Sequence, residues 1–150
     1  MKVEIYSRQA IEELLKGEFP RNTAVISFSD PKGSFGACSP VKFGDKVKYV
    51  FKVAIHDIDL SVLPEFGLTY ETYFPEADSL AKFIIDMKNA GMNIICQCEY
   101  GESRSSGCAA AILEYFYGTG ISIFADYRYY PNQVVYHKVY DALKKAKKNI

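Results

Sequence analysis

The sequence predicts an α/β fold in which a mostly parallel central sheet lies between layers of helices, as a three-layer sandwich. Two observations lead to this prediction. Short apolar stretches of strand length alternate along the chain with longer amphipathic stretches, which is typical of strands joined by helices. One short stretch, residues 23–28 (Thr-Ala-Val-Ile-Ser-Phe), is almost continuously apolar. Such a strand is expected where a parallel sheet is buried on both faces.

The individual elements follow from apolar periodicity and from residues that start or stop helices. Ser7 is a favourable N-cap for a helix over residues 8–16, because its hydroxyl can accept a hydrogen bond from the first helical turn, and Gly17 ends that helix. Strands are predicted over residues 3–6, 23–28, 47–55 and 93–97. Further helices are predicted over residues 75–92, 105–117, 121–130 and 132–148. Irregular or turn structure is predicted over residues 29–45, 60–72 and 118–120.

Length and charge limit the class of protein. The chain has 150 residues, which is enough for one hydrophobic core, and we expect a single domain over residues 1–150. Its 18 basic and 18 acidic side chains balance, so the net charge gives no attraction for nucleic acid. Residues 1–17 lack the apolar core of a signal peptide, and no apolar run approaches membrane-spanning length. We therefore expect a cytoplasmic protein that binds neither nucleic acid nor membrane.

The stretch from Asn93 to Ala111 is where the sequence predicts function. Its apolar, β-branched run stops at Cys98, a polar loop follows, and a helical pattern of small residues begins near Ser105. Such a loop directs successive backbone N–H groups inward, and the helix start adds positive potential. The hollow therefore attracts an anion with several acceptor oxygens, such as phosphate. The same field favours the thiolate of Cys98, and the planar guanidinium of Arg104 suits two phosphate oxygens.

The pattern C-x-x-G-x-x-R-S, formed by Cys98, Gly101, Arg104 and Ser105, resembles the signature of the cysteine-dependent protein tyrosine phosphatases. It is most similar to that of the small dual-specificity phosphatases and their bacterial relatives. The resemblance implies a protein tyrosine phosphatase-like fold and a phosphomonoesterase that needs neither metal nor cofactor and forms a cysteinyl-phosphate intermediate. The family usually has His immediately before the nucleophile. This chain has Gln97 instead, whose amide can also donate hydrogen bonds.

The resemblance also implies a role for each residue of the loop. Cys98 would attack phosphorus, and Ser105 would contact its thiolate and assist breakdown of the intermediate. In isolation Ser105 is equally well explained as an N-cap. The Arg104 guanidinium and backbone N–H groups would hold the phosphate oxygens. The residues that supply these N–H groups would be Glu99, Tyr100, Gly101, Glu102, Ser103 and Arg104.

A general acid must come from a different loop to protonate the leaving oxygen. Asp57 follows the third predicted strand, where the dual-specificity phosphatases carry their acid, and it is our choice. Asp59 is the alternative. Because parallel strands end at the same edge of a sheet, Asp57 and Cys98 can face one site.

The loop side chains indicate the class of substrate. Glu99 and Glu102 are acidic, and no Lys lies between Cys98 and Arg104. A phosphoinositide phosphatase would be expected to add basic groups there. We therefore expect the partner to be a phosphorylated protein or a small aryl phosphate. The tyrosines of residues 127–130 would assist if they border the cleft, although packing is their commoner role.

Other interpretations remain open at this point. The loop could belong to a catalytically weak phospho-binding module, or to a rhodanese-like domain that transfers sulfur or phosphate. The cysteines lack metal-ligand spacing, and Cys96 and Cys108 are expected in the core. Either of them could instead protect Cys98 through a reversible disulfide, for which Cys108 is better placed. Cys38 has no assigned role.

Overall fold

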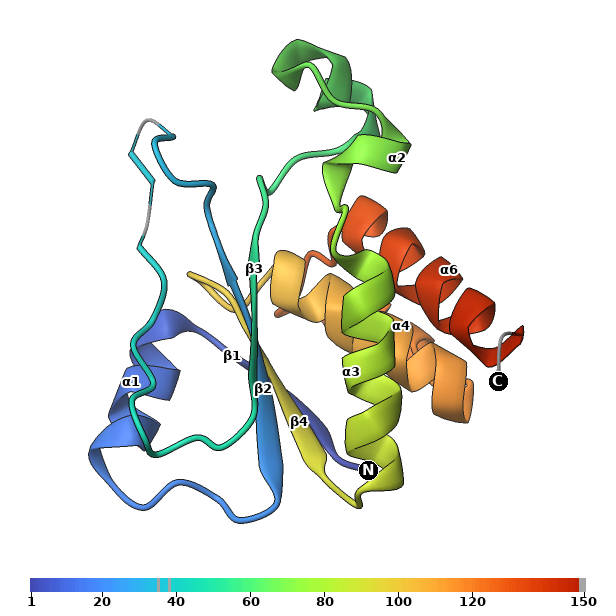
Figure 1. The fold of residues 1–150 in the computed structure, drawn as a ribbon. Coiled ribbons are helices and arrows are strands. Elements are labelled where there is room, and N and C mark those ends of the chain that lie inside the picture. The colour runs from blue at the N-terminus through green and yellow to red at the C-terminus, as the bar shows by residue number, and fades with distance from the viewer. Residues whose placement is uncertain (35, 38, 149–150) are drawn as a thin grey trace.

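The centre of the fold is a parallel sheet (Figure 1). The computed structural model describes residues 1–34, 36, 37 and 39–148, and within them the sheet has four strands. These are β1 (Val3–Tyr6), β2 (Thr23–Ser29), β3 (Val50–Ala54) and β4 (Asn93–Gln97). They lie in the order β1-β4-β2-β3, and each neighbouring pair is parallel. Their carboxyl ends therefore share one edge, where such folds hold their ligands.

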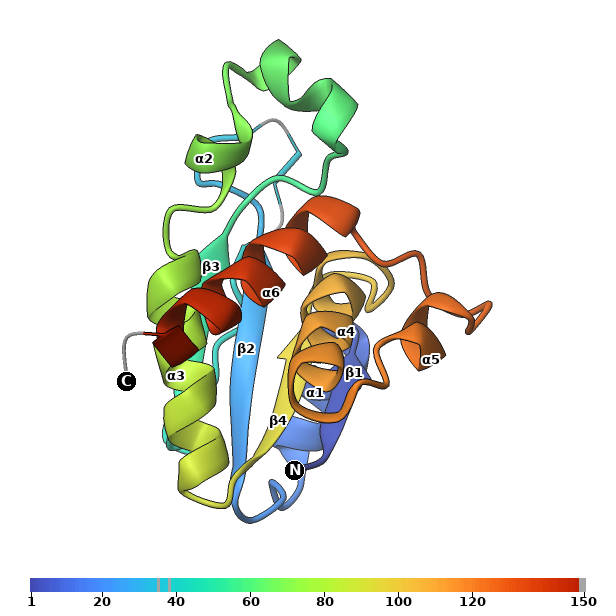
Figure 2. The same cartoon turned by 90° about the vertical axis from the view of Figure 1, so that its right-hand side faces the viewer.

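Helices cover both faces of the sheet, which gives three layers (Figures 1 and 2). α1 (Arg8–Lys16) lies on one face. The other face is covered by α3 (Ala77–Asn89), α4 (Arg104–Tyr117) and α6 (Gln133–Lys148). Short helical segments lie in the connections, namely η1 (Leu60–Phe66), α2 (Tyr70–Tyr73) and α5 (Ile121–Phe124). The predicted three-layer sandwich is confirmed. No helix among the described residues is long and apolar enough to cross a lipid bilayer.

Two apolar clusters hold these layers together. Between the sheet and α1, Ile11 packs with Val25 and Ile95, and all three side chains are buried. On the opposite face a larger cluster joins α3, α4 and α6 to the sheet. Successive residues of a strand point to opposite faces. β2, whose seven residues are all buried, therefore contributes to both clusters, which explains its almost continuous apolar sequence.

The turn between β1 and α1 supports the loop that follows β4. The Ser7 hydroxyl accepts a hydrogen bond from the Ala10 amide at 3.1 Å, so the predicted N-cap is confirmed. The next residue, Arg8, donates its backbone amide to the Glu99 carbonyl at 3.0 Å. Gly101 has a φ of +69°, and a Cβ there would lie 2.8 Å from the Ser7 nitrogen. Glycine is required at this position, because the two loops touch through their backbones.

Four segments differ from their prediction. α3 spans Ala77–Asn89 and is shorter than the predicted residues 75–92. β3 spans Val50–Ala54 and is shorter than the predicted residues 47–55, because its pairing with β2 begins at Val50. Val47 packs into the cluster beside α1. Residues 60–72, predicted as irregular, contain η1 and α2. Residues 121–130, predicted as a helix, contain only one helical turn, α5. The Tyr130 amide donates to the Glu102 carbonyl at 2.8 Å, and this tertiary hydrogen bond ties the irregular end of that segment to the Cys98 loop.

Helix α4 approaches the start of α6 through small residues. Gly107 lies against the backbone of Asn132, and a Cβ on it would lie 2.5 Å from the Asn132 carbonyl oxygen. The neighbouring residues Ala109, Ala110 and Ala111 are fully buried. This close approach fixes the position of Asn132 relative to the first turn of α4, and Asn132 takes part in the site described below.

We expect Gly107→Ala to lower the free energy of unfolding by about 1–3 kcal/mol, because neither backbone can yield easily to an added methyl group. Urea denaturation measures the change. Gly17→Ala is the matched control: a Cβ on Gly17 would meet nothing within 4 Å, and the φ of Gly17 is −105°. That variant should be unchanged or more stable by up to about 1 kcal/mol. Equal stability of both variants would contradict the close contact.

Candidate active site

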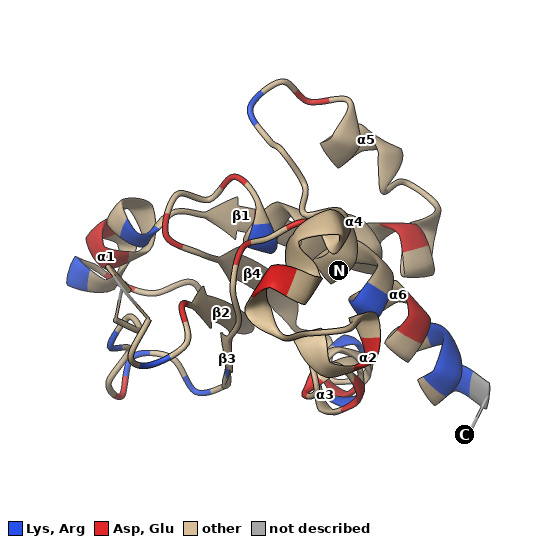
Figure 3. Ribbon diagram, turned by 90° about the horizontal axis from the view of Figure 1, so that it is seen from above, with Lys and Arg blue, Asp and Glu red and all other residues tan. Residues whose placement is uncertain are grey.

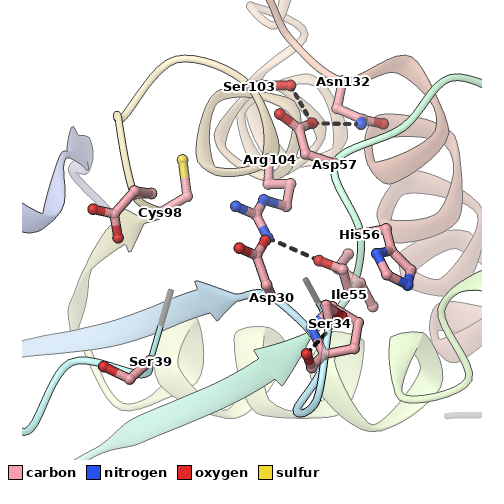
Figure 4. Close-up of polar contacts among 12 residues, drawn as sticks. Asp30, Ser34, Ser39, Ile55, His56, Asp57, Cys98, Ser103, Arg104 and Asn132 are labelled. Atoms are coloured by element: carbon pink, nitrogen blue, oxygen red, sulfur yellow. Dashed lines mark hydrogen bonds and ion pairs between the residues drawn. The ribbon is translucent and has the colours of Figure 1, made fainter. Parts of the chain in front are cut away.

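Cys98 stands immediately after β4, at the carboxyl edge of the sheet (Figure 4). Its amide donates to the Tyr6 carbonyl at 3.3 Å, which ties it to the end of β1. Only 3% of the residue is exposed, and its Sγ lies 3.0 Å from the Ser105 hydroxyl oxygen in the first turn of α4. The sulfur and the hydroxyl predicted to act together are thus in hydrogen-bonding contact.

Gln97 holds the backbone at Cys98. Its side chain is buried, its Nε2 donates to the Cys98 carbonyl at 3.0 Å, and its Oε1 accepts from the Ser27 hydroxyl of β2. The Gln amide therefore both donates and accepts between two neighbouring strands. This agrees with the expectation that the Gln97 amide can donate a hydrogen bond to the loop.

Arg104, the first residue of α4, carries a buried guanidinium with an unused donor. Its side chain is 6% exposed. Nη1 donates to Asp30 at 2.9 Å and to the Ile55 carbonyl at 2.8 Å (Figure 4). Its Nε is buried and has no hydrogen-bond partner among the described residues. A buried N–H without a partner is destabilising. An oxyanion in the hollow would satisfy this donor, so Arg104 is suited to bind one.

The loop is held from outside through its carbonyl groups. The Glu99 carbonyl accepts from Arg8, the Glu102 carbonyl from Tyr130 and the Ser103 carbonyl from the Asn132 amide. In a trans peptide the C=O and the next N–H point in opposite directions. The amides that follow these carbonyls therefore point toward the inside of the loop. Inward N–H groups at the start of a helix form a site for an anion.

Asp57 is joined to this loop by its side chain. One carboxylate oxygen, Oδ1, accepts from the Ser103 hydroxyl at 2.6 Å and from Asn132 Nδ2 at 2.9 Å (Figure 4). The structure thus brings Asp57 to the rim of the Cys98 loop. Asp59 precedes η1, where its side chain makes no capping hydrogen bond, and it lines the groove next to Asp57. The roles predicted for these carboxylates stay predictions.

Tyr73 supports the segment that carries Asp57. Its hydroxyl donates to the His56 carbonyl, next to Asp57 in the chain. Burial, together with the negative charge of Asp57, raises the pKa of Tyr73 well above its usual range. The hydroxyl therefore keeps its proton and its role as a donor at any physiological pH.

The other described cysteines lie in the core behind the site. Cys96 and Cys108 are fully buried free thiols. A hydrogen bond with Cys108, together with burial, raises the pKa of Cys96 well above its ordinary value. Such a thiol is unreactive, which agrees with the expected place of Cys96 in the core. Cys108 contacts Cys96, and its proposed disulfide with Cys98 stays untested. Cys38 lies outside the described residues.

The sequence reasoning missed two residues of the site. Asp30, which binds Arg104, follows the carboxyl end of β2, so the rule that selected Asp57 after β3 could also have found it. Asn132 caps α6, since its Oδ1 accepts from the Val135 amide at 2.9 Å. Its second role, holding Asp57, depends on chain segments distant in sequence and has no local signal.

The fold class follows from the strand order of the parallel sheet. Cys98 at the end of β4 and the buried Arg104 at the start of α4 agree with it. The chain has the fold of the cysteine-based protein tyrosine and dual-specificity phosphatases. No family model matches its sequence, and no curated protein is similar enough to match.

Solved structures of that class match nearly the whole chain. A mouse putative dual specificity phosphatase complexed with zinc tungstate is 14% identical, with a TM-score of 0.55 over 98% of this chain and 85% of that one. Human DUSP28 is 14% identical, with a TM-score of 0.54 over 99% and 95%. PTPMT1 in complex with PI(5)P is 11% identical, with a TM-score of 0.54 over 99% and 94%. At these low sequence identities, the similarity to the solved structures shows the fold alone.

Tungstate, an oxyanion of phosphate-like shape, should raise the melting temperature of the protein. At a concentration of 100 Kd the stabilisation is about 2.7 kcal/mol. Arg104→Lys should lose most of this shift, because an ammonium group cannot replace both the buried contacts and the free Nε donor. Arg128→Lys is the control, since Arg128 is exposed and pairs with Asp126. Equal shifts in both variants would rule out Arg104 as the anion ligand.

Proposed function

We propose that this chain is a metal-independent phosphomonoesterase that acts on phosphorylated proteins or small aryl phosphates through a cysteinyl-phosphate intermediate. The observation that supports this most is the guanidinium of Arg104, which is buried at the carboxyl edge of the sheet and has an unpartnered Nε. A purely structural arginine would have its donors satisfied by the protein. In this proposal residues 1–150 act as one domain, and no metal or cofactor takes part.

The first step transfers the phosphoryl group to sulfur. The Cys98 thiolate attacks phosphorus in line with the leaving oxygen, so that an S–P bond forms as the P–O bond breaks. Arg104 and the inward amides hold the equatorial oxygens, and this supplies electrostatic stabilisation of the transition state. Asp57 gives its proton to the leaving oxygen. Both donors to Asp57 use Oδ1, so Oδ2 is the atom that carries this proton.

The second step hydrolyses the intermediate. Asp57, now a carboxylate, accepts a proton from a water molecule that attacks phosphorus, and the S–P bond breaks to release inorganic phosphate. The sulfur leaves as a thiolate. The Ser105 hydroxyl, 3.0 Å from Sγ, donates a hydrogen bond to that thiolate and so makes it a better leaving group.

Activity on a small aryl phosphate in the presence of a chelator tests the proposal. Cys98→Ser should reduce the rate to background, and Arg104→Lys should lower it by about 10²–10³-fold. Cys108→Ala, which removes a thiol from the core, is the matched control and should remain active. Phosphopeptide binding without turnover would instead indicate a phospho-binding module. Transfer of sulfur from thiosulfate to cyanide would indicate a rhodanese-like reaction.

The general acid is tested through its dependence on the leaving group. Asp57→Asn should slow hydrolysis of phosphotyrosine by about 10²-fold. The leaving group of this substrate is the basic tyrosine phenolate, which needs a proton as it departs. The loss should be smaller with nitrophenyl phosphate, whose leaving group is stable without one. Asp59→Asn is the matched control and should affect both substrates equally and weakly. If the loss depends on the leaving group in Asp59→Asn and not in Asp57→Asn, the general acid is Asp59.

A further inference from the structure

A groove adjoins the Cys98 loop on the side of Asp57. It has a volume of about 830 Å³, which is in the range of ligand sites. One wall is the segment that carries Asp57 and Asp59, and the other is the segment between α5 and α6. Ser103 lines the groove and also belongs to the loop. The groove therefore adjoins the Cys98 loop at Ser103, and we refer to it as the acidic groove.

The charges of the acidic groove all have one sign. Its walls include Asp57, Asp59 and Asp126, and no Lys or Arg of the described chain is among the lining residues. Asp126 is partly neutralised by Arg128 at 2.7 Å. In Figure 3, which views this edge of the sheet from above, acidic residues lie on the loops around the start of α4. Since the whole chain is neutral, this concentration is a local property of the groove.

Exposed aromatic rings complete the acidic groove. Tyr127 is 90% exposed and Tyr130 is 74% exposed, and both line it with Phe124 and Tyr129. The face of an aromatic ring attracts cations. The Arg128 guanidinium already lies 5.1 Å from the Tyr129 ring centre, so rings of this segment do accept a cation. Carboxylates next to exposed rings suit a Lys or Arg side chain.

The opposite side of the loop is also acidic. A second groove of about 670 Å³ has more carboxylates than basic side chains. Its charged lining residues are Arg8, Glu12, Glu13, Lys16, Glu99 and Glu102. Arg8 pairs with Glu99 and Lys16 pairs with Glu13. Both basic side chains of this second groove are therefore neutralised by neighbouring carboxylates. A chain crossing the anion hollow therefore meets negative charge on either side.

We propose that the substrate is a phosphorylated polypeptide with a Lys or Arg beside the phosphorylated residue, whose basic side chain lies in the acidic groove. This inference rests on the proposed function. The nine-tenths buried Arg104, with its unpartnered Nε, marks the place of the phosphate, and Ser103 and Asp57 connect that place to the groove. A substrate with several phosphates, such as a phosphoinositide, would bring further negative charge against these carboxylates and be repelled.

Three phosphotyrosine peptides that differ only in the flanking residues test the inference. With Lys or Arg beside phosphotyrosine, kcat/KM should exceed that of the alanine peptide by about tenfold, and glutamate should lower it further. The preference should shrink in roughly 0.5 M salt, because exposed charges are screened. Equal kcat/KM for all three peptides, or a higher value for a soluble inositol phosphate, would overturn the inference.

Variants locate the preference in the acidic groove. Tyr127→Lys places a positive charge in the groove and should reduce the tenfold ratio to about one. Tyr49→Lys is the matched control, since Tyr49 precedes β3 at the opposite edge of the sheet. It should leave the ratio unchanged. A ratio that persists in Tyr127→Lys would place the recognition elsewhere and reject the groove.

A small aryl phosphate separates this inference from the proposed function. If it is hydrolysed while the peptides show no preference, the inference fails and the phosphatase function stands. If neither the aryl phosphate nor any peptide is hydrolysed, the function fails. Titration of the same peptides into Cys98→Ser then still decides the inference, since preferential binding of the basic peptide supports it and equal binding rejects it.

Discussion

Burying the guanidinium of Arg104 at the carboxyl edge of the sheet carries a high desolvation cost, and much of the surrounding structure serves to offset it. Asp30, at the end of β2, supplies the counter-charge, and the Ile55 carbonyl, just beyond β3, supplies an acceptor. The first turn of α4 presents the side chain. Only a parallel sheet brings the ends of these strands and the start of that helix to one edge. The Nε of Arg104 is left buried and without a partner among the described residues, and the proposed phosphate would supply one.

The Cys98 loop has little regular structure of its own and depends on three other parts of the chain. The start of α1 holds Glu99, the connection before α6 holds Glu102 and Ser103, and Gln97 holds the backbone at the cysteine itself. Such contacts fix the directions of the loop amides before any ligand arrives. Preorganised donors avoid the cost of reordering when charge develops on the ligand.

The sequence predicted the elements whose signals are local. The first and last strands, the Ser7 cap and the helix after Cys98 agree with their predicted bounds within a residue, because apolar periodicity and capping residues act over short distances. Residues 121–130 were predicted as a helix. Beyond the helical turn α5 they form turns and irregular structure, and the Tyr130 amide bonds to the carbonyl of the distant Glu102. Asn132 was missed in the site because its role depends on Asp57, a residue distant in the chain. Asp30 follows a strand end, as Asp57 does, and the same rule could have found it.

The hydrogen bonds from Tyr130 and Asn132 to the loop carbonyls also have a consequence for biosynthesis. During translation the cysteine emerges well before these two residues. The loop cannot take its final shape until the chain beyond the start of α6 has left the ribosome. Until then the Glu102 and Ser103 carbonyls lack the amides of Tyr130 and Asn132 as partners. The Cys98 loop therefore reaches its final shape only after all four described strands have been synthesised.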